Sequence, residues 1–108
     1  MSLDIYLEAG EVEFEWFNIT HNLATMASKA GLYVAMWTPE RLSKDEVRAE
    51  DVIDALAEGI ARLVKDRVAL IQLNPENGWG TYEGLLRVAT QYLIACVENP
   101  ELHVRASR

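Results

Sequence analysis

Cysteine is almost absent from this sequence: Cys96 is the only one in 108 residues. A single cysteine excludes an intramolecular disulfide and a cysteine-rich zinc site, so a reducing compartment, the cytoplasm, is expected. No apolar run approaches the roughly 18 residues that a membrane-spanning helix needs. No basic segment leads into an apolar one near the start of the chain, so a signal peptide is not expected either.

Basic residues are also scarce. The chain has 10 Lys and Arg against 17 Asp and Glu, a net charge of −7. A nucleic-acid-binding surface needs clustered Lys and Arg, so nucleic acid is not an expected partner. Residues 1–28 contain five acidic and no basic side chains. Such a segment is usually a solvated face, and the alternative is a surface that attracts a basic partner.

Length and composition are those of one globular domain spanning residues 1–108. Half of the residues are hydrophobic and a quarter are charged, which is neither a disordered nor a fibrous composition. No internal repeat, low-complexity tract or linker divides the chain. A chain of this length can bury one core between two layers.

The N-terminal segment has the alternation of a β-hairpin. Apolar side chains recur at every second position in Leu3–Leu7, and Val12, Phe14 and Trp16 alternate with glutamates in residues 11–16. Period-2 alternation predicts strands with one buried and one solvated face. The short Ala9-Gly10 connection predicts a hairpin, with Val12, Phe14 and Trp16 facing the core.

Helices are predicted for the middle of the chain. The first covers residues 23–30, with Asn22 as its N-cap and Gly31 after its last turn, and Thr38-Pro39 starts a further turn. A capping box at Ser43–Glu46 predicts a longer helix to about residue 65. A final helix is predicted over residues 81–98, before Asn99-Pro100. Periodicity does not decide between strand and helix for residues 68–73. Alternation over residues 101–106 predicts a third strand.

Strands at both ends with helices between them predict an α+β fold. We expect a small antiparallel sheet, made of the N-terminal hairpin and the C-terminal strand, packed on one face against two to four helices. A three-stranded sheet leaves unpaired edges, which is an ordinary reason for a small domain to form a homodimer.

A run of polar side chains follows the second predicted strand. If the extended conformation continues, Asn18, Thr20 and Asn22 lie on the same side as the apolar row. One interpretation is local, with Thr20 or Asn22 capping the next helix. The other is a ligand-facing row, because a buried unpaired amide or hydroxyl costs roughly 1–3 kcal/mol. The adjacent Trp16-Phe17 breaks the alternation, so a bulge that shifts its phase is a further alternative.

A second notable run extends from Asn74 to Tyr82 and enters the last predicted helix. Glycines on both sides of Trp79 allow positive φ or a close approach to another segment. The indole is then either a plug that closes the core or a flat face on which a ligand stacks. The free N–H groups at the start of the following helix favour an anion.

Together these two runs resemble a family of small uncharacterised bacterial and phage proteins. The family pattern is Asn-[Ile/Val]-Thr-x-Asn after a strand pair, then Asn-Pro-x-Asn-Gly-Trp-Gly-x-Tyr at the entry to a helix. The matching positions here are Asn18, Thr20 and Asn22 in the first motif and Asn77, Gly78, Trp79, Gly80 and Tyr82 in the second. Longer members have an insert between the first two strands, where this chain has a tight turn. The resemblance implies the fold and the site but supplies no activity.

Residues for catalysis or metal binding are sparse. His21 and His103 are far apart in the sequence and lack the spacing of metal ligands. Cys96 falls on the apolar face of the last predicted helix, where a thiol is usually inert. No Gly-x-Ser-x-Gly motif is present. A small hydrolase or transferase using His21 is therefore only a third hypothesis, with no catalytic residue assigned.

The leading hypothesis is a non-enzymatic cytoplasmic binding module for a small polar ligand or a peptide. The expected ligand-binding residues are Asn18, Thr20, Asn22, Asn77, Trp79 and Tyr82. Amides supply donors and acceptors and an indole supplies a stacking face; no cofactor, metal, nucleic acid or membrane partner is expected. The alternative is an acidic protein–protein interaction module, such as a phage-encoded modifier of a host protein, in which Glu11, Glu13 and Glu15 attract a basic partner.

Overall fold

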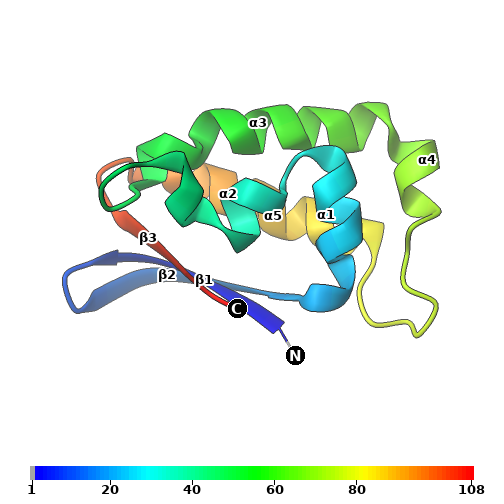
Figure 1. Ribbon diagram of the computed structural model, residues 1–108, viewed down its shortest axis with the longest axis horizontal. Coiled ribbons are helices and arrows are strands. Elements are labelled where there is room, and N and C mark those ends of the chain that lie inside the picture. The colour runs from blue at the N-terminus through cyan, green and yellow to red at the C-terminus, as the bar shows by residue number, and fades with distance from the viewer. Residues whose placement is uncertain (1) are drawn as a thin grey trace.

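The computed structural model describes residues 2–108 and has the predicted α+β fold. Three antiparallel strands lie in the order β2-β1-β3, and the helices cover one face of this sheet (Figure 1). The strands are β1 (Ser2–Ala9), β2 (Val12–Thr20) and β3 (His103–Ser107). The prediction of a hairpin joined by a C-terminal strand is therefore confirmed.

Five α-helices and two 3-10 helices are present in residues 2–108, against the two to four helices predicted. They are η1 (His21–Leu23), α1 (Ala24–Ala30), α2 (Tyr33–Trp37), η2 (Pro39–Leu42), α3 (Ala49–Lys65), α4 (Arg67–Ile71) and α5 (Tyr82–Glu98). The segment that periodicity left open is helical, as α4. None of the helices in residues 2–108 has the length and apolar character to cross a membrane.

Two predicted helix starts are wrong. α3 begins at Ala49 rather than after Ser43, because Val47 and Arg48 pair with β3: the Val104 N–H donates to the Val47 carbonyl at 2.9 Å. The Asp51 carboxylate then accepts the Arg48 N–H at 2.9 Å and supports the first turn. Asn22 does not cap α1, since it lies inside the 3-10 helix η1 that precedes it. The end of α1 at Gly31, in the left-handed conformation with φ of +81°, is as predicted.

The inner face of the sheet comes mainly from β1. Leu3, Ile5 and Leu7 are fully buried beneath the helices, and in the antiparallel register Leu3 pairs with Ile19 and Ile5 with Phe17. Asp4 and Tyr6 alternate with them and lie on the outer face. The hairpin therefore has one buried and one solvated face, as its alternation in β1 predicts.

The predicted burial of Val12, Phe14 and Trp16 is wrong. Their side chains are 58%, 57% and 57% exposed. The register shifts between Leu7 and Glu8, which pair with Glu15 and Glu13, so Phe14 is an extra residue that changes the phase of β2. The tip of the hairpin also extends past the helices (Figure 1).

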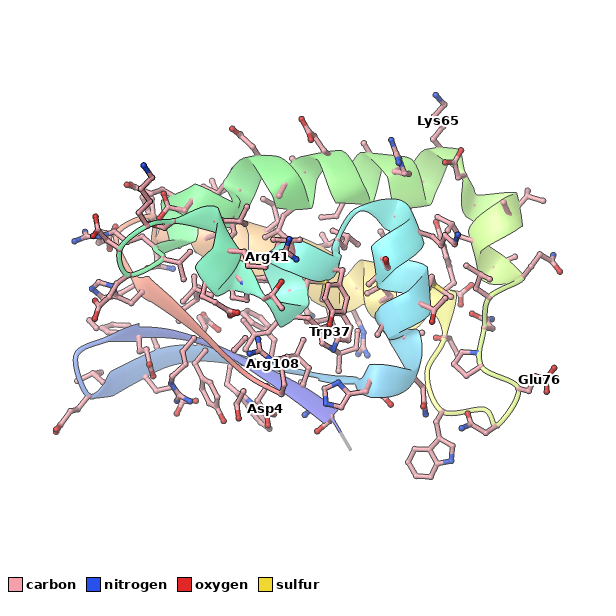
Figure 2. The ribbon with its side chains drawn as sticks, in the orientation of Figure 1. Asp4, Trp37, Arg41, Lys65, Glu76 and Arg108 are labelled. Carbon is pink, nitrogen blue, oxygen red and sulfur yellow. The ribbon has the colours of Figure 1, made fainter. Side chains whose placement is uncertain are left out.

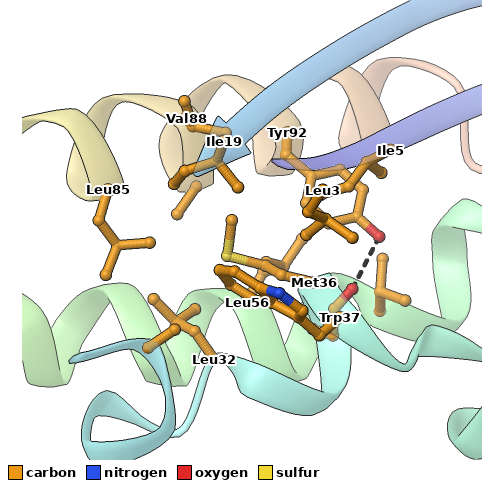
Figure 3. Packing of buried hydrophobic residues seen from close by; sticks show 14 of the residues in the cluster. Leu3, Ile5, Ile19, Leu32, Met36, Trp37, Leu56, Leu85, Val88 and Tyr92 are labelled. Carbon is orange, nitrogen blue, oxygen red and sulfur yellow. Dashed lines mark hydrogen bonds between the residues drawn. The ribbon is translucent and has the colours of Figure 1, made fainter. Parts of the chain in front are cut away.

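One hydrophobic cluster joins the sheet to the helices (Figure 3). Tyr92 of α5 is buried in it, packs 5.8 Å from the ring of Phe17 and donates its hydroxyl to the Ala35 carbonyl at 2.9 Å. Burial raises the pKa of Tyr92 well above its ordinary value. This residue links β2, α2 and α5, and α5 in turn packs against α3. The core therefore fixes the end of β2 relative to the start of α5.

Candidate functional site

The outer face of β2 presents Asn18 and Thr20 near the end of the strand. They lie on the same side as Trp16, as predicted, but that side faces solvent rather than the core. The Asn18 amide donates to the hydroxyl of Ser2 at 2.9 Å and to the carboxylate of Asp4 at 2.8 Å. Asn18 is thus held by β1 through its NH₂ group, while its carbonyl oxygen accepts no hydrogen bond from residues 2–108.

The chain turns from β2 into η1 at Thr20. The Thr20 hydroxyl accepts the Asn22 N–H at 3.3 Å, so part of the capping interpretation holds, with Thr20 as the cap. The Asn22 side chain is exposed and makes no hydrogen bond within residues 2–108. Its amide is therefore available as both donor and acceptor.

The second motif forms a loop between α4 and α5. Asn77 accepts the backbone N–H of Trp79 at 2.9 Å, which closes a turn around Gly78. Gly78 and Gly80 have φ of +76° and +104°, conformations that side chains other than glycine rarely adopt. Thr81 then caps α5 by accepting the Gly84 N–H at 3.0 Å.

The two motifs come into contact at Gly80. A Cβ placed on this residue would lie 2.7 Å from Cγ2 of Thr20 and 2.9 Å from Cγ of Leu23. Real Cβ atoms do not approach other carbon atoms this closely. Only glycine therefore lets the loop pack against the end of β2.

This contact creates an open pocket of about 520 Å³. Its lining comes from both motifs and the start of β1: Ser2, Asn18, Thr20, Asn22, Asn77 and Trp79. None of these side chains is charged, although the chain as a whole carries −7. The Trp79 side chain is 69% exposed, so it is not the core plug that one interpretation predicted. The pocket therefore combines free amide groups with an accessible indole.

Tyr82 does not line this pocket, although it was predicted among the ligand-binding residues. Its side chain is buried, and its hydroxyl donates to the backbone carbonyl of Leu63 on α3. Its backbone N–H donates to the Asn74 side chain at 2.8 Å. Tyr82 therefore anchors the start of α5 to α3 and to the loop.

Two contributors were not anticipated from the sequence. Ser2 enters the pocket because the hairpin register sets it opposite Thr20, and the register of a hairpin does not follow from alternation alone. Asn74 fixes the entry to α5. The Asn-Pro dipeptide is a turn signal that marks this position, but it does not identify the backbone group that the side chain binds.

Asp4 lies beside the pocket on the face of the sheet away from the helices, whereas Trp37 lies on the helix side (Figure 2). Hydrogen bonds from Asn18 and then Trp16 to its carboxylate hold the pKa of Asp4 below its ordinary value of 3.8. The carboxylate is therefore ionised at neutral pH and orients Asn18 by accepting its N–H.

The other titratable candidates lie apart from the pocket lining. His21 accepts the indole N–H of Trp37 at its Nδ1 atom, at 2.9 Å. Cys96 is fully buried, and burial raises the pKa of its thiol to about 12. No group of three or more His, Cys, Asp or Glu side chains in the described part of the chain is arranged to hold a metal ion.

A second hollow, of about 400 Å³, lies near the tip of the hairpin. Its lining includes the carboxylates of Glu8, Glu40 and Glu46 together with His103 and Arg105. Arg105 donates to Glu8 at 2.9 Å and stacks on Tyr6, with 4.1 Å from the guanidinium carbon to the ring centroid. Neither sequence motif contributes to this hollow, so the pocket between the motifs is the stronger candidate.

Comparisons of the chain with protein-family models, with curated proteins and with solved structures found no match. The resemblance to the small bacterial and phage family stays a prediction.

Proposed function

We propose that this protein is a non-enzymatic binding module for a small, neutral, polar ligand. The observation that carries the proposal is the junction of two sequence-distant motifs, which lines one pocket entirely with uncharged polar and aromatic side chains. Ligand pockets typically occupy about 300–1,000 Å³ and combine apolar faces with a few placed polar groups. The pocket volume of about 520 Å³ falls within that range.

The polar groups define the ligand chemistry. The Asn22 amide and the Asn18 carbonyl oxygen offer hydrogen bonds that no residue among 2–108 uses. The side-chain oxygen of Asn77 accepts the Trp79 N–H, which leaves the NH₂ group of Asn77 free to donate to a ligand. The ligand therefore needs both donors and acceptors, as nucleosides, sugars and peptide groups have.

Trp79 defines the shape of the ligand. An exposed indole held by the turn at Asn77 offers a flat apolar face at the side of the amide groups. Stacking of a planar or ring-shaped group on that face buries apolar area that solvent now contacts. No charged side chain lines the pocket, and the Asp4 carboxylate beside it already accepts hydrogen bonds from Asn18 and Trp16, so an ionic ligand would lose hydration without gaining a free counter-ion.

A thermal-shift screen tests the proposal. Nucleosides, free sugars and blocked dipeptides are added to the purified protein. A ligand at a hundred times its dissociation constant stabilises the folded state by about 2.7 kcal/mol. In a domain of this size the melting temperature then rises by roughly ten degrees or more.

Asn22→Ala and Trp79→Ala are the decisive variants, because both side chains are exposed and their removal leaves the core intact. The matched control is Phe14→Ala, which removes an exposed aromatic ring outside the pocket. The proposal requires a shift that both pocket variants lose and the control keeps. A screen with no shift, or a shift that survives in both pocket variants, would overturn it.

A further inference from the structure

A second surface, independent of the pocket, lies between the edge strand β2 and helix α5. It is an open groove of about 370 Å³. Trp16 and Phe17 of β2 form one wall, and Ile94 of α5 lies on the other. Glu15 and Glu98 flank the apolar lining.

The wall formed by β2 is the free edge of the sheet. In the order β2-β1-β3, β2 pairs only with β1 among the strands in residues 2–108. An edge strand presents alternate N–H and C=O groups that have no partner, and proteins usually shield such edges. Here the side chains next to the edge are exposed apolar ones: Phe14 and Trp16 at 57% each, and Ile94 at 51%.

The charges around the groove have one sign. Glu15 of β2 and Glu98 of α5 line the groove, and Glu11 and Glu13 lie further toward the tip of the hairpin. No Lys or Arg lines the groove in the described residues. An occupant that carries positive charges beside apolar side chains therefore complements both features.

A second copy of this chain does not complement them. When two identical strands pair antiparallel about a two-fold axis, residues equally distant from the axis oppose each other. Strand β2 of a second copy has no Lys or Arg, so in no register does it bring a positive charge to Glu15 or Glu98, and centring on Glu13, Phe14 or Glu15 also opposes one glutamate to another. Like charges directly opposite each other destabilise strand pairing.

We propose that this groove binds an extended segment of a partner protein, with apolar and basic residues together on the side that faces the groove, as a fourth strand beside β2. The backbone of the segment bonds to the free edge of β2, which is the usual source of affinity in strand addition. On the inner side, which Phe17 shares with the buried row of β1, its apolar side chains enter the groove against Phe17 and Ile94. Glu15 is paired with Leu7 and so shares this inner side, and a Lys or Arg two positions along the segment, on the same side as its apolar residues, pairs with Glu15 or Glu98.

The probe is a synthetic seven-residue peptide with blocked ends and the sequence Val-Thr-Lys-Thr-Val-Thr-Lys, which as a strand carries Val and Lys on one face. Its binding is followed by amide hydrogen exchange and by NMR shifts of the ¹⁵N-labelled protein. We expect the outward-facing amides of β2 to exchange at least tenfold more slowly with the peptide bound. The same peptide with N-methyl groups on alternate residues loses the backbone bonds, and we expect it to bind at least tenfold more weakly.

Charge reversal supplies the matched comparison. Glu15→Lys and Glu98→Lys are expected to weaken binding at least fivefold each, whereas Glu58→Lys makes the same change in net charge on an exposed face of α3. Glu98→Lys alone supplies the comparison if Glu15→Lys unfolds.

Unchanged exchange at β2, equal binding of the N-methylated peptide, or equal loss in Glu58→Lys would overturn the proposal. A concentration-dependent dimer in sedimentation, with β2 amides protected before any peptide is added, would assign the edge to a second copy and overturn it as well. None of these results tests the ligand pocket, because the residues that line the groove do not line the pocket.

Discussion

Asp4 shows how single side chains prepare the site. Its carboxylate accepts hydrogen bonds from Asn18 at 2.8 Å and from the Trp16 indole at 3.0 Å. Because both donors favour the ionised form, the pKa of Asp4 is lowered in the folded state. The contribution of this group to stability is therefore present above its unfolded pKa and is lost as the pH falls through its folded value.

The resulting prediction concerns acid. Between pH 7 and pH 2, the melting temperature of the native protein should fall more than that of Asp4→Asn, which has no charge to lose. NMR titration of the Asp4 carboxyl carbon in the Asn18→Ala variant should give a pKa nearer the ordinary 3.8, since the largest cause of the shift has gone. Trp16→Phe, which removes the second donor, should produce a smaller rise. An identical titration in Asn18→Ala and in the native protein would contradict this account.

Residue types predicted which side chains lie together better than they predicted the surroundings of each one. The chemistry of Asn18, Thr20, Asn22, Asn77 and Trp79 indicates ligand-binding residues, and all five line one pocket. Tyr82 matched the same motif but is buried, because the first turn of α5 packs on α3. Whether a motif side chain points into a pocket or into the core depends on tertiary packing, which a motif does not contain.

Among the helices and strands, β2 is the element whose burial the periodic pattern predicted wrongly. Alternation of Val12, Phe14 and Trp16 with glutamates is the pattern of a half-buried strand, yet these three apolar side chains are all exposed. A strand's alternation predicts burial only where another layer covers it and where the register has no bulge. Neither condition holds at this end of the hairpin.

The loop before α5 supplies a prediction at the same scale. Gly80→Ala should destabilise the fold by about 2–4 kcal/mol, because it adds a Cβ clash with Thr20 and Leu23 to the roughly 1–2 kcal/mol cost of positive φ. Gly78→Ala is the matched control, since it also has positive φ but meets no atom within 4 Å. Urea denaturation of both variants measures the difference. Equal losses would show that the loop does not pack against the end of β2.

For the whole molecule, the fold class followed from the order of the elements, whereas the site depended on a contact between distant segments. Strands at both ends and helices between them were sufficient to predict an antiparallel sheet covered on one face. That the loop around Trp79 reaches Thr20 required the docking of α5 on β2 through Phe17 and Tyr92. Such long-range packing is not encoded in local periodicity, so the sequence predicted both halves of the site without placing them together.

The central claim is that these two halves act as one binding site. The most direct test is a ¹⁵N NMR titration with nucleosides, sugars and blocked dipeptides, observing the side-chain N–H groups. We predict that one of these classes shifts the amides of Asn18, Asn22 and Asn77 and the indole of Trp79 with a single dissociation constant. The side-chain amides of Gln91 and Asn99, which lie outside the pocket, should stay unchanged. Spectra in which no compound moves the four pocket signals, or in which they titrate with different constants, would contradict the claim.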